Sequence, residues 1–262
     1  MSSQAKLPGV ATTAWASLVF LYVPILAVIV FSFNSSRLIT VWEGFSVDWY
    51  FSALRNDALR AATFNSLVVG AGSTICSTVI ALMVAIAMRS RKVPQAVEQV
   101  SYLMMTLPLL IPEIVIAIAS MTFFAAIGLK LGLGNVLIAH IVFCIPFAYS
   151  PIRARMDTLQ PSLFEAAADL YADPWHTFRQ VTLPLMTPGI VSGAMLAFIT
   201  SIDDFIITQM VAPPGAMTLP VYIYSMVRKG ITPEINAISA ILLVISIVFV
   251  LLSYLLNQRK AV

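Results

Sequence analysis

Six long apolar stretches dominate this sequence and constrain what it can fold into. They cover residues 13–33, 62–88, 100–127, 135–152, 186–209 and 236–257. A helix needs about 20 apolar residues to cross the hydrocarbon core of a bilayer. These continuous stretches also lack the short alternating pattern of membrane barrel strands. The sequence therefore predicts an all-α membrane protein, with residues 1–262 forming a single transmembrane domain of six spans.

Charged side chains are too few to cover a water-exposed surface. They make up 10% of the chain, whereas a soluble domain has about 25%. Most of the surface must therefore face lipid or other membrane helices. The net charge of +3 includes no basic cluster typical of nucleic-acid binding, so we expect no nucleic-acid partner. Cys76 and Cys144 lie in apolar stretches without partners at metal-binding or disulfide spacing, and we expect both to be packing residues.

The positions of Lys and Arg predict that both termini lie in the cytoplasm. If the N-terminus is inside, nine basic residues fall on the cytoplasmic side and six on the outer side. The basic residues that lie close to span ends carry most weight in such an orientation. The cytoplasmic set is Lys6, Arg89, Arg91, Lys92, Arg153, Arg155, Arg179, Arg259 and Lys260, and the outer set is Arg37, Arg55, Arg60, Lys130, Arg228 and Lys229.

The cytoplasmic loop 153–183 carries helix signals that the other loops lack. Ser162 and Glu165 have the spacing of a capping box, which predicts Ser162 as the N-cap of a short helix. Asp173 followed by Pro174 predicts the start of a second helix, with Asp173 as its N-cap. The loop is therefore expected to form two short amphipathic helices.

These two helices need a cover for their apolar faces. Trp175, Phe178 and Val181 lie three residues apart and would form one apolar stripe. Pro184 is expected to block further helix just before the fifth span. One interpretation is that the loop packs against the protein's own span ends. The other is that it forms a docking site for a soluble partner.

Three acidic residues, Glu113, Asp203 and Asp204, lie within predicted spans. A charged residue near a span centre costs about 2.5–3.5 kcal/mol on insertion scales, so their presence indicates a function, namely an aqueous pathway for a cation. The alternative is that these carboxyls are protonated, or bonded to Ser, Thr or backbone groups. At 1.5 Å per residue, Glu113 would lie about 20 Å deep and the Asp pair roughly 26–27 Å deep. The acids would then form a series along the pathway.

Neighbouring residues refine this hypothesis. Asp203 and Asp204 point about 100° apart on a helix, so one is expected to face the pathway and the other a neighbouring helix. Pro108 and Pro112 disrupt the third span, either as a simple kink or as a break whose free carbonyls contact a cation. His140 is expected to be a hydrogen-bonded packing residue.

Aromatic side chains near the outer ends of the spans are the other candidate partners of a cation. Each of them can instead be an anchor at the membrane interface. The candidates are Trp49, Tyr50, Phe205, Tyr222 and Tyr224.

The segment Glu165-Ala166-Ala167-Ala168-Asp169-Leu170, followed by Leu183-Pro184, resembles the EAA loop of bacterial ABC importer permeases. The resemblance implies the type I permease fold, in which this loop forms coupling helices that contact an ATP-hydrolysing subunit. Tyr171 stands where the family usually has Gly, and Tyr tolerates a positive φ poorly. The turn is therefore expected either to be made differently or to have a strained backbone. The implied coupling residues are Glu165, Ala166, Ala167, Asp169, Leu170, Tyr171, Leu183 and Pro184.

Motifs along nearly the whole chain are similar to those of spermidine/putrescine importer permeases of the second permease subunit type. The resemblance implies polyamine import, from periplasm to cytoplasm, across the bacterial inner membrane. It also implies a second homologous permease subunit, two copies of an ATP-binding subunit and a periplasmic polyamine-binding protein. The motifs are Asn34-Ser35-Ser36-Arg37, Trp42, Gly44-Phe45, Trp49-Tyr50, Pro112-Glu113-Ile114, His140 to Cys144, Ser201-Ile202-Asp203-Asp204, Tyr224 to Val227 and Pro233 to Ala237.

The chain has no Gly-rich phosphate loop of the Walker type. We therefore expect a non-catalytic transport subunit without a cofactor of its own, with ATP and Mg²⁺ bound by the partner ATPase. Two alternatives remain open. One is an ABC importer permease for another cationic or small solute, and the other is a proton-coupled secondary transporter that uses the three acids as proton carriers.

Overall fold

The fold is helical throughout the part of the chain that the computed structural model describes, which is residues 9–38, 41–89, 93–130, 132–229 and 233–258. Within these ranges the only strand-like pairing is a single bridge between Asn34 and Phe45. The all-α prediction is therefore confirmed. Part of the predicted orientation signal lies outside the described residues, namely Lys6, Arg91, Lys92, Arg259 and Lys260.

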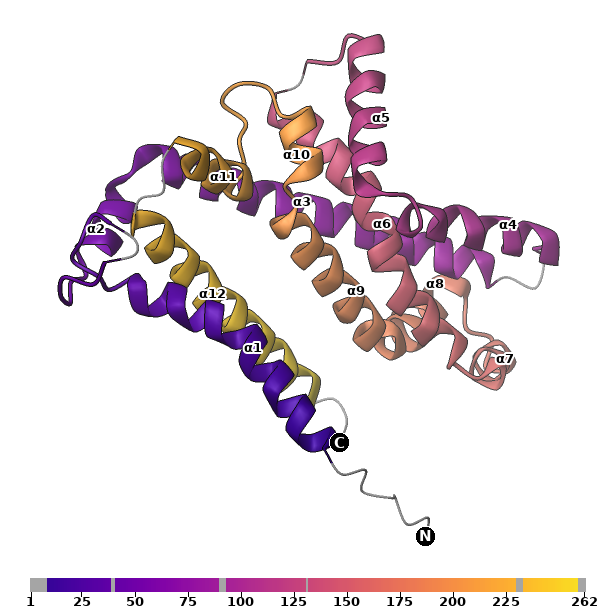
Figure 1. Ribbon diagram of the computed structural model, residues 1–262. Coiled ribbons are helices and arrows are strands. Elements are labelled where there is room, and N and C mark those ends of the chain that lie inside the picture. The colour runs from indigo at the N-terminus through magenta and orange to yellow at the C-terminus, as the bar shows by residue number, and fades with distance from the viewer. Residues whose placement is uncertain (1–8, 39–40, 90–92, 131, 230–232, 259–262) are drawn as a thin grey trace. The chain divides into compact units, whose positions relative to one another are not determined.

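The helices follow one another along the chain with short connections (Figure 1). They are α1 (Val10–Phe31), α2 (Asp48–Arg55), α3 (Asp57–Met88), α4 (Gln95–Thr106), η1 (Leu107–Leu109), α5 (Glu113–Ala126), α6 (Leu133–Asp157), α7 (Pro161–Asp169), α8 (Pro174–Thr177), η2 (Phe178–Thr182), α9 (Leu183–Asp203), α10 (Ile206–Val211), α11 (Leu219–Lys229) and α12 (Pro233–Gln258).

Four described helices are long and apolar enough to cross a membrane. They are Thr12–Phe31, Asp57–Met88, Leu133–Asp157 and Pro174–Asp203. They correspond to the first, second, fourth and fifth predicted spans. In the region of the sixth predicted span, Pro233–Ile245 is a shorter apolar helix within α12. The six-span arrangement remains a prediction.

The third predicted span, 100–127, is not one continuous helix. The segments Gln95–Leu109 and Glu113–Ala126 are bent by 100° at the break between them. Pro108 lies in the 3₁₀ turn η1, and Pro112 is the N-cap of α5. Each proline lacks an amide hydrogen and clashes with the preceding turn. Two of them four residues apart therefore break the helix, so the simple-kink interpretation is wrong.

The chain divides into two compact units, and the first comprises Met1–Arg60 and Ile223–Val262. Within it α1 and α12 lie side by side, and α2 packs against α12 (Figure 1). Asn56, which ends α2, donates a hydrogen bond of 3.2 Å from Nδ2 to Oε1 of Glu234 on α12. This bond ties the end of α2 to the start of α12.

The second unit, Ala61–Tyr222, is built on the contact between α6 and α9 (Figure 1). Gly189 and Gly193 let the two backbones approach closely. A Cβ atom on Gly193 would lie 2.6 Å from the carbonyl oxygen of Ala148, and one on Gly189 would lie 2.5 Å from Cβ of Arg155. Small residues four apart serve this purpose in membrane helix pairs.

The fifth predicted span begins and ends differently from the prediction. Pro184 does not block the helix, because the π-helical turn η2 carries it without interruption from Pro174 to Asp203. The wider turn changes the local hydrogen-bond register, which fits a residue that has no amide hydrogen to donate. At the other end the helix stops at Asp203, because Asp204 has an extended backbone with ψ 127°. The predicted continuation to residue 209 is a separate helix, α10.

The two cysteines differ in their surroundings. Cys144 is fully buried, and its Sγ lies 3.4 Å from the carbonyl oxygen of Ala197 on α9. The packing role predicted for it is confirmed. Cys76 is exposed in this chain, so the same prediction for Cys76 is wrong. Its place in an apolar stretch reflects a helix face that no other part of the described chain covers.

Candidate functional site

The break between α9 and α10 is held by the side chain of Asp204. This carboxylate is buried, with 4% of the residue exposed. It accepts hydrogen bonds from the backbone amides of Ile207 (3.1 Å) and Thr208 (2.9 Å) and from the Thr208 hydroxyl (2.8 Å). Asp204 therefore caps α10 in the way that an aspartate caps any helix start.

His140 joins this break to α6. The imidazole is fully buried. Its Nε2 lies 2.9 Å from the hydroxyl of Thr208 and 3.1 Å from Oδ2 of Asp204, and its Nδ1 lies 2.8 Å from the hydroxyl of Ser201. The prediction that His140 is a hydrogen-bonded packing residue is confirmed.

The same polar network reaches two further helices. The Ser73 hydroxyl of α3 donates a hydrogen bond of 2.9 Å to the Ser201 hydroxyl. On the other side, the carboxyl group of Glu113 lies beside that of Asp204 and interacts with it. Glu113 is the first residue of α5, which packs against α10. The network therefore connects α3, α5, α6, α9 and α10 through polar side chains within a largely apolar unit.

The acids do not form the predicted series. The depth estimate assumed one straight third span, whereas the 100° bend places Glu113 at the start of a new helix. There its carboxyl group meets Asp204 directly. The expectation of two carboxyls separated along a pathway is therefore wrong for this pair.

Asp203 and Asp204 face different surroundings, as their 100° separation predicts. Asp204 is buried in the network, whereas Asp203 is exposed and makes no hydrogen bond or ion pair with any described residue. Phe205 follows in the break and is half-buried, and Tyr222 is buried in α11. The two aspartates therefore have different chemical capacities: Asp203 is available to an external partner, and Asp204 is occupied by the protein.

Trp49 and Tyr50 belong to the first unit, where both stabilise the loop between α1 and α2. Nε1 of Trp49 donates a hydrogen bond of 2.9 Å to the carbonyl oxygen of Asn34, and the hydroxyl groups of Tyr50 and Ser32 lie 2.6 Å apart. The aromatic ring of Tyr50 also lies 5.2 Å from that of Phe33. Their polar groups are thus used within the loop, although both side chains remain partly exposed.

Tyr224 of the first unit already has a cationic neighbour within the chain. The guanidinium of Arg228, one turn further along α11, lies 5.3 Å from the centre of the Tyr224 ring. The ring is 41% exposed. This contact shows that the tyrosine face accepts a cation in this setting.

The helices of the loop 153–183 start partly as predicted. Asp173 caps α8, accepting hydrogen bonds from the amides of Trp175 (2.8 Å) and His176 (2.9 Å). The capping box at Ser162 is wrong, because α7 already starts at Pro161 with Gln160 as its N-cap. Proline has a fixed φ suited to the first helical position, so Ser162 becomes the second helical residue and has no cap role.

The turn after α7 shows what Tyr171 does in place of glycine. Its φ is +53°, and it is the only described residue other than glycine with a positive φ. Its amide donates a hydrogen bond of 2.9 Å to the carbonyl oxygen of Ala168. The turn is therefore left-handed with tyrosine in it. In this conformation the Cβ atom lies too close to the following carbonyl oxygen, so the backbone is strained.

The predicted coupling residues lie mostly on the surface of this unit. Ala167 is buried, whereas Leu170 is 80% exposed and Tyr171 is 97% exposed. Trp175 of α8 is 67% exposed, although its ring also contacts that of Phe178 at 5.5 Å. The other members, Glu165, Ala166, Asp169, Leu183 and Pro184, are exposed as well. The loop therefore packs one face on its own unit and leaves an apolar surface uncovered.

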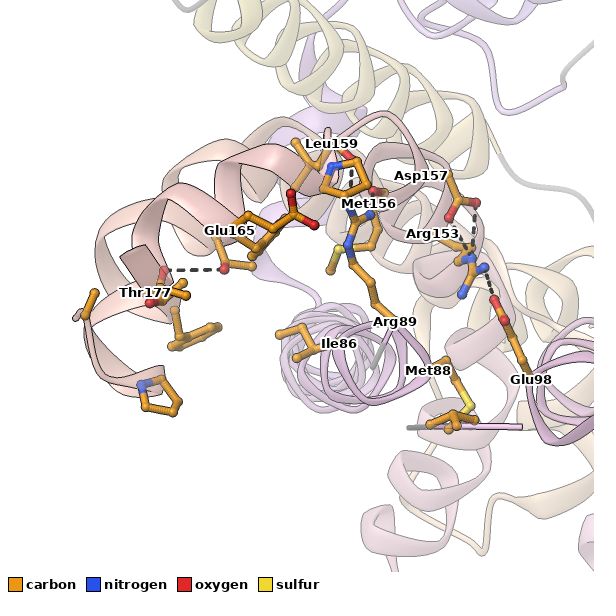
Figure 2. A pocket seen from close by; sticks show the side chains of 18 residues that line it. Ile86, Met88, Arg89, Glu98, Arg153, Met156, Asp157, Leu159, Glu165 and Thr177 are labelled. Carbon is orange, nitrogen blue, oxygen red and sulfur yellow. Dashed lines mark hydrogen bonds and ion pairs between the residues drawn. The ribbon is translucent and has the colours of Figure 1, made fainter. Parts of the chain in front are cut away.

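Arg89, at the end of α3, holds α7 against the unit. Its guanidinium donates to the carbonyl oxygens of Met156 and Leu159, the latter at 2.6 Å, and lies 5.0 Å from the ring centre of Phe164. Figure 2 shows Arg89 in a cavity of about 940 Å³, close to Glu165 of α7. Nearby, Arg153 of α6 pairs with Glu98 of α4 and with Asp157. The ends of α3, α4, α6 and α7 are thus fixed together.

Sequence reasoning missed several residues that stabilise the α9–α10 break and the loop 153–183. Ser73, Thr208 and Ser201 are polar side chains within apolar stretches, and that was the available signal. Arg89 was read as an orientation charge, although its position directly after a span end puts it within reach of the carbonyls that end a neighbouring helix. No signal in one sequence links these residues, because their partners lie far away along the chain.

Comparisons with known proteins agree with the geometry. The profile of the family described as the binding-protein-dependent transport system inner membrane component matches residues 77–261. The spermidine/putrescine transport system permease protein PotC of Escherichia coli strain K12 is 37% identical over 244 residues, covering 92% of this chain and 90% of that protein. The putrescine transport system permease protein PotI of the same strain is 36% identical over 230 residues, covering 86% and 82%.

Solved structures with the same fold include ABC importers of different solutes. A bacterial ABC transporter involved in the import of the acidic polysaccharide alginate has a chain that aligns with a TM-score of 0.71 at 16% identity, covering 99% of this chain and 98% of that one. A chain of the MetNI methionine ABC transporter aligns with a TM-score of 0.60 at 21% identity, covering 76% and 92%. The predicted fold class, that of type I ABC importer permeases, is confirmed.

Fold and relatives together define a membrane-embedded, non-catalytic transport subunit. The chain belongs to the binding-protein-dependent transport system inner membrane component family.

Proposed function

We propose that this chain is a permease subunit that imports polyamines, with Asp203 as the carboxylate that meets the cationic cargo. The observation that carries the proposal is the exposed carboxylate of Asp203 at the helix break, without a partner among the described residues. An ionised group in a membrane span is too costly to face lipid. It therefore faces either a neighbouring subunit or an aqueous pathway, and an acid in such a pathway attracts a cation.

The fold does not identify the transported solute, so the identity of the cargo must be inferred from side chains and from related sequences. The fold is shared with a chain of an alginate importer, whose cargo is acidic. Relatives at 36–37% identity are named for spermidine and putrescine, which are polycations. Glu113 supplies a second, half-buried carboxyl group beside the break. Two carboxyls at one break suit amines that are spaced along a flexible chain.

The energy source in this proposal is a partner ATPase, which holds the ATP and Mg²⁺. The chain has no phosphate-binding loop, and the exposed apolar residues Leu170, Tyr171 and Trp175 give the loop 153–183 a surface suited to docking. A large exposed apolar surface of this kind is typical of an interaction site. The proposed assembly contains a second homologous permease, two copies of the ATPase and a periplasmic polyamine-binding protein, with this chain crossing the bacterial inner membrane six times and both termini in the cytoplasm.

Asp203→Asn tests the cargo contact. We expect uptake of radiolabelled putrescine and spermidine to fall about tenfold or more, because an amide cannot balance the charge of an ammonium group that has lost its hydration. Uptake is measured in cells that produce the chain with its partner subunits, at equal amounts of assembled protein. Asp57→Asn is the matched control, since Asp57 is 95% exposed at the start of α3 and its removal is expected to leave uptake unchanged.

Unchanged polyamine uptake in the Asp203→Asn variant would remove the main support for a cation pathway at this site. Uptake that continues without the ATPase partner would instead favour a proton-coupled secondary transporter. Competition by other cations, with no competition by polyamines, would favour an importer of another cationic solute.

The docking surface makes a separate prediction. Trp175→Ala is expected to weaken binding of the ATPase subunit by about 2 kcal/mol, or roughly 30-fold, as for a buried aromatic hot spot. The measurement is co-purification of the ATPase and titration of its binding to the detergent-solubilised permease. Phe123→Ala is the control, because Phe123 is an aromatic residue of α5 with similar exposure, 59% against 67%. Equal ATPase binding by both variants would contradict a docking role for the loop.

A further inference from the structure

His140 contacts residues on both sides of Asp203 in the chain: Ser201, two positions before it, and Asp204, directly after it. Its Nδ1 lies 2.8 Å from the Ser201 hydroxyl of α9, and its Nε2 lies 3.1 Å from Oδ2 of Asp204 in the break. The imidazole therefore clamps the last turn of α9 to α6 at two points, with Ile202 and Asp203 between them.

The residue next to Asp203 is held by another helix. A Cβ atom on Gly70 of α3 would lie 3.0 Å from Cδ1 of Ile202, so the Ile202 side chain fills the space that the glycine leaves. Three of the four residues from 201 to 204 are thus fixed by α3 or α6. Asp203 projects from the remaining side, where it is exposed.

Both ring nitrogens of His140 have polar partners. The Thr208 hydroxyl donates to Oδ2 of Asp204, and both of these groups lie within hydrogen-bond distance of Nε2. On the other side of the ring, Nδ1 contacts the Ser201 hydroxyl, which Ser73 also contacts. One chain of hydrogen bonds therefore runs from Ser73 through Ser201 and His140 to Asp204.

We infer that His140 is a positioning residue for transport: through Ser201 and Asp204 it fixes the α9–α10 break so that the Asp203 carboxylate points away from α6. The inference rests on the proposed function, in which Asp203 meets the cargo. It assigns no direct cargo contact to His140, whose ring is fully buried.

Substitutions of His140 that keep or remove its contacts with Ser201 and Asp204 test the inference. His140→Ala is expected to lower polyamine uptake about tenfold, whereas His140→Gln is expected to keep at least half of it, because its amide nitrogen reaches the position of Nε2 and donates to Asp204. Val136→Ala is the matched control. Val136 lies one turn before His140 on α6, is equally buried and has no polar side-chain atom. Cys144 is unsuitable for this purpose because its thiol contacts Ser73 and Ser201.

A double-mutant cycle separates positioning from general structural support. If His140 acts through Asp203, His140→Ala lowers uptake no further in an Asp203→Asn background. A further loss of about tenfold in that background would overturn the inference, as would equal loss in His140→Ala and His140→Gln. All variants are compared at equal amounts of protein that elutes as one assembled species.

A second measurement does not depend on transport. Asp203→Cys, in a background with Cys76→Ala that keeps the fully buried Cys144, is modified with a charged, water-soluble thiol reagent. We expect His140→Ala to change the modification rate at least about fivefold and His140→Gln to leave it within about twofold, because only the first releases the break. Unchanged rates in both variants would overturn the positioning role. A shifted rate combined with normal uptake in Asp203→Asn would retain the positioning role and reject the proposed cargo contact.

Discussion

Asp204→Ala is expected to destabilise the folded chain by about 3–5 kcal/mol, the usual cost of removing one partner from a buried polar pair. The substitution leaves His140, Thr208 and the amide of Ile207 without their acceptor. It also removes the cap of α10. The measurement is the midpoint of thermal unfolding in detergent, together with the yield of assembled protein. Uptake should fall because less folded protein is present.

Asp203→Asn is the internal control for this prediction. It changes the adjacent residue, which is exposed and has no partner among the described residues. Its unfolding midpoint is expected to match that of the natural protein, while its uptake falls. Two aspartates side by side would then fail in different ways. An Asp204→Ala variant with normal stability and impaired uptake would show instead that Asp204 contacts the cargo directly.

Gly193→Ala is expected to destabilise the α6–α9 pair by about 3 kcal/mol, at the upper end of the cost of overpacking. The added Cβ would lie 2.6 Å from the carbonyl oxygen of Ala148, which is backbone and cannot turn aside. The two helices must therefore move apart along their whole contact. Gly193→Leu, with three more carbon atoms at the same place, is expected to give no assembled protein.

Gly72→Ala is the matched control, because it also introduces alanine in a long helix. There the added Cβ would lie 2.9 Å from Cδ1 of Leu137, the far end of a flexible side chain that can change rotamer. We expect its unfolding midpoint to stay close to that of the natural protein. If both alanine variants were equally stable, close backbone approach at Gly193 would not be the basis of this helix pair.

The sequence was most informative where a single local interaction decides the structure. The apolar stretches predicted the fold class, and Asp173 followed by Pro174 predicted the start of α8. The capping box at Ser162 failed because Pro161 competes for the same helix start one residue earlier. A motif that is satisfied by two alternative registers is decided by the residue with the more restricted backbone, which here is proline.

The candidate site was only partly predictable. The three acids were found because charge is rare within apolar stretches. Their arrangement was not found, because it depends on two helix breaks and on His140, which lies more than sixty residues before Asp204 in the chain. The number of residues between two groups gives their separation only along an unbroken helix, and both the third and the fifth spans are broken.

The unbroken helix from Pro174 to Asp203 has a mechanical consequence. It starts beside the exposed Trp175 and ends at the carboxylate of the break, a length of roughly 45 Å at 1.5 Å per residue. A helix is stiff along its axis and about it, so a push or twist applied near Trp175 arrives at Asp203 with little loss. The π turn shifts the register of this helix but does not interrupt it. The first place where rotation can be absorbed is the extended backbone of Asp204, where the chain changes direction.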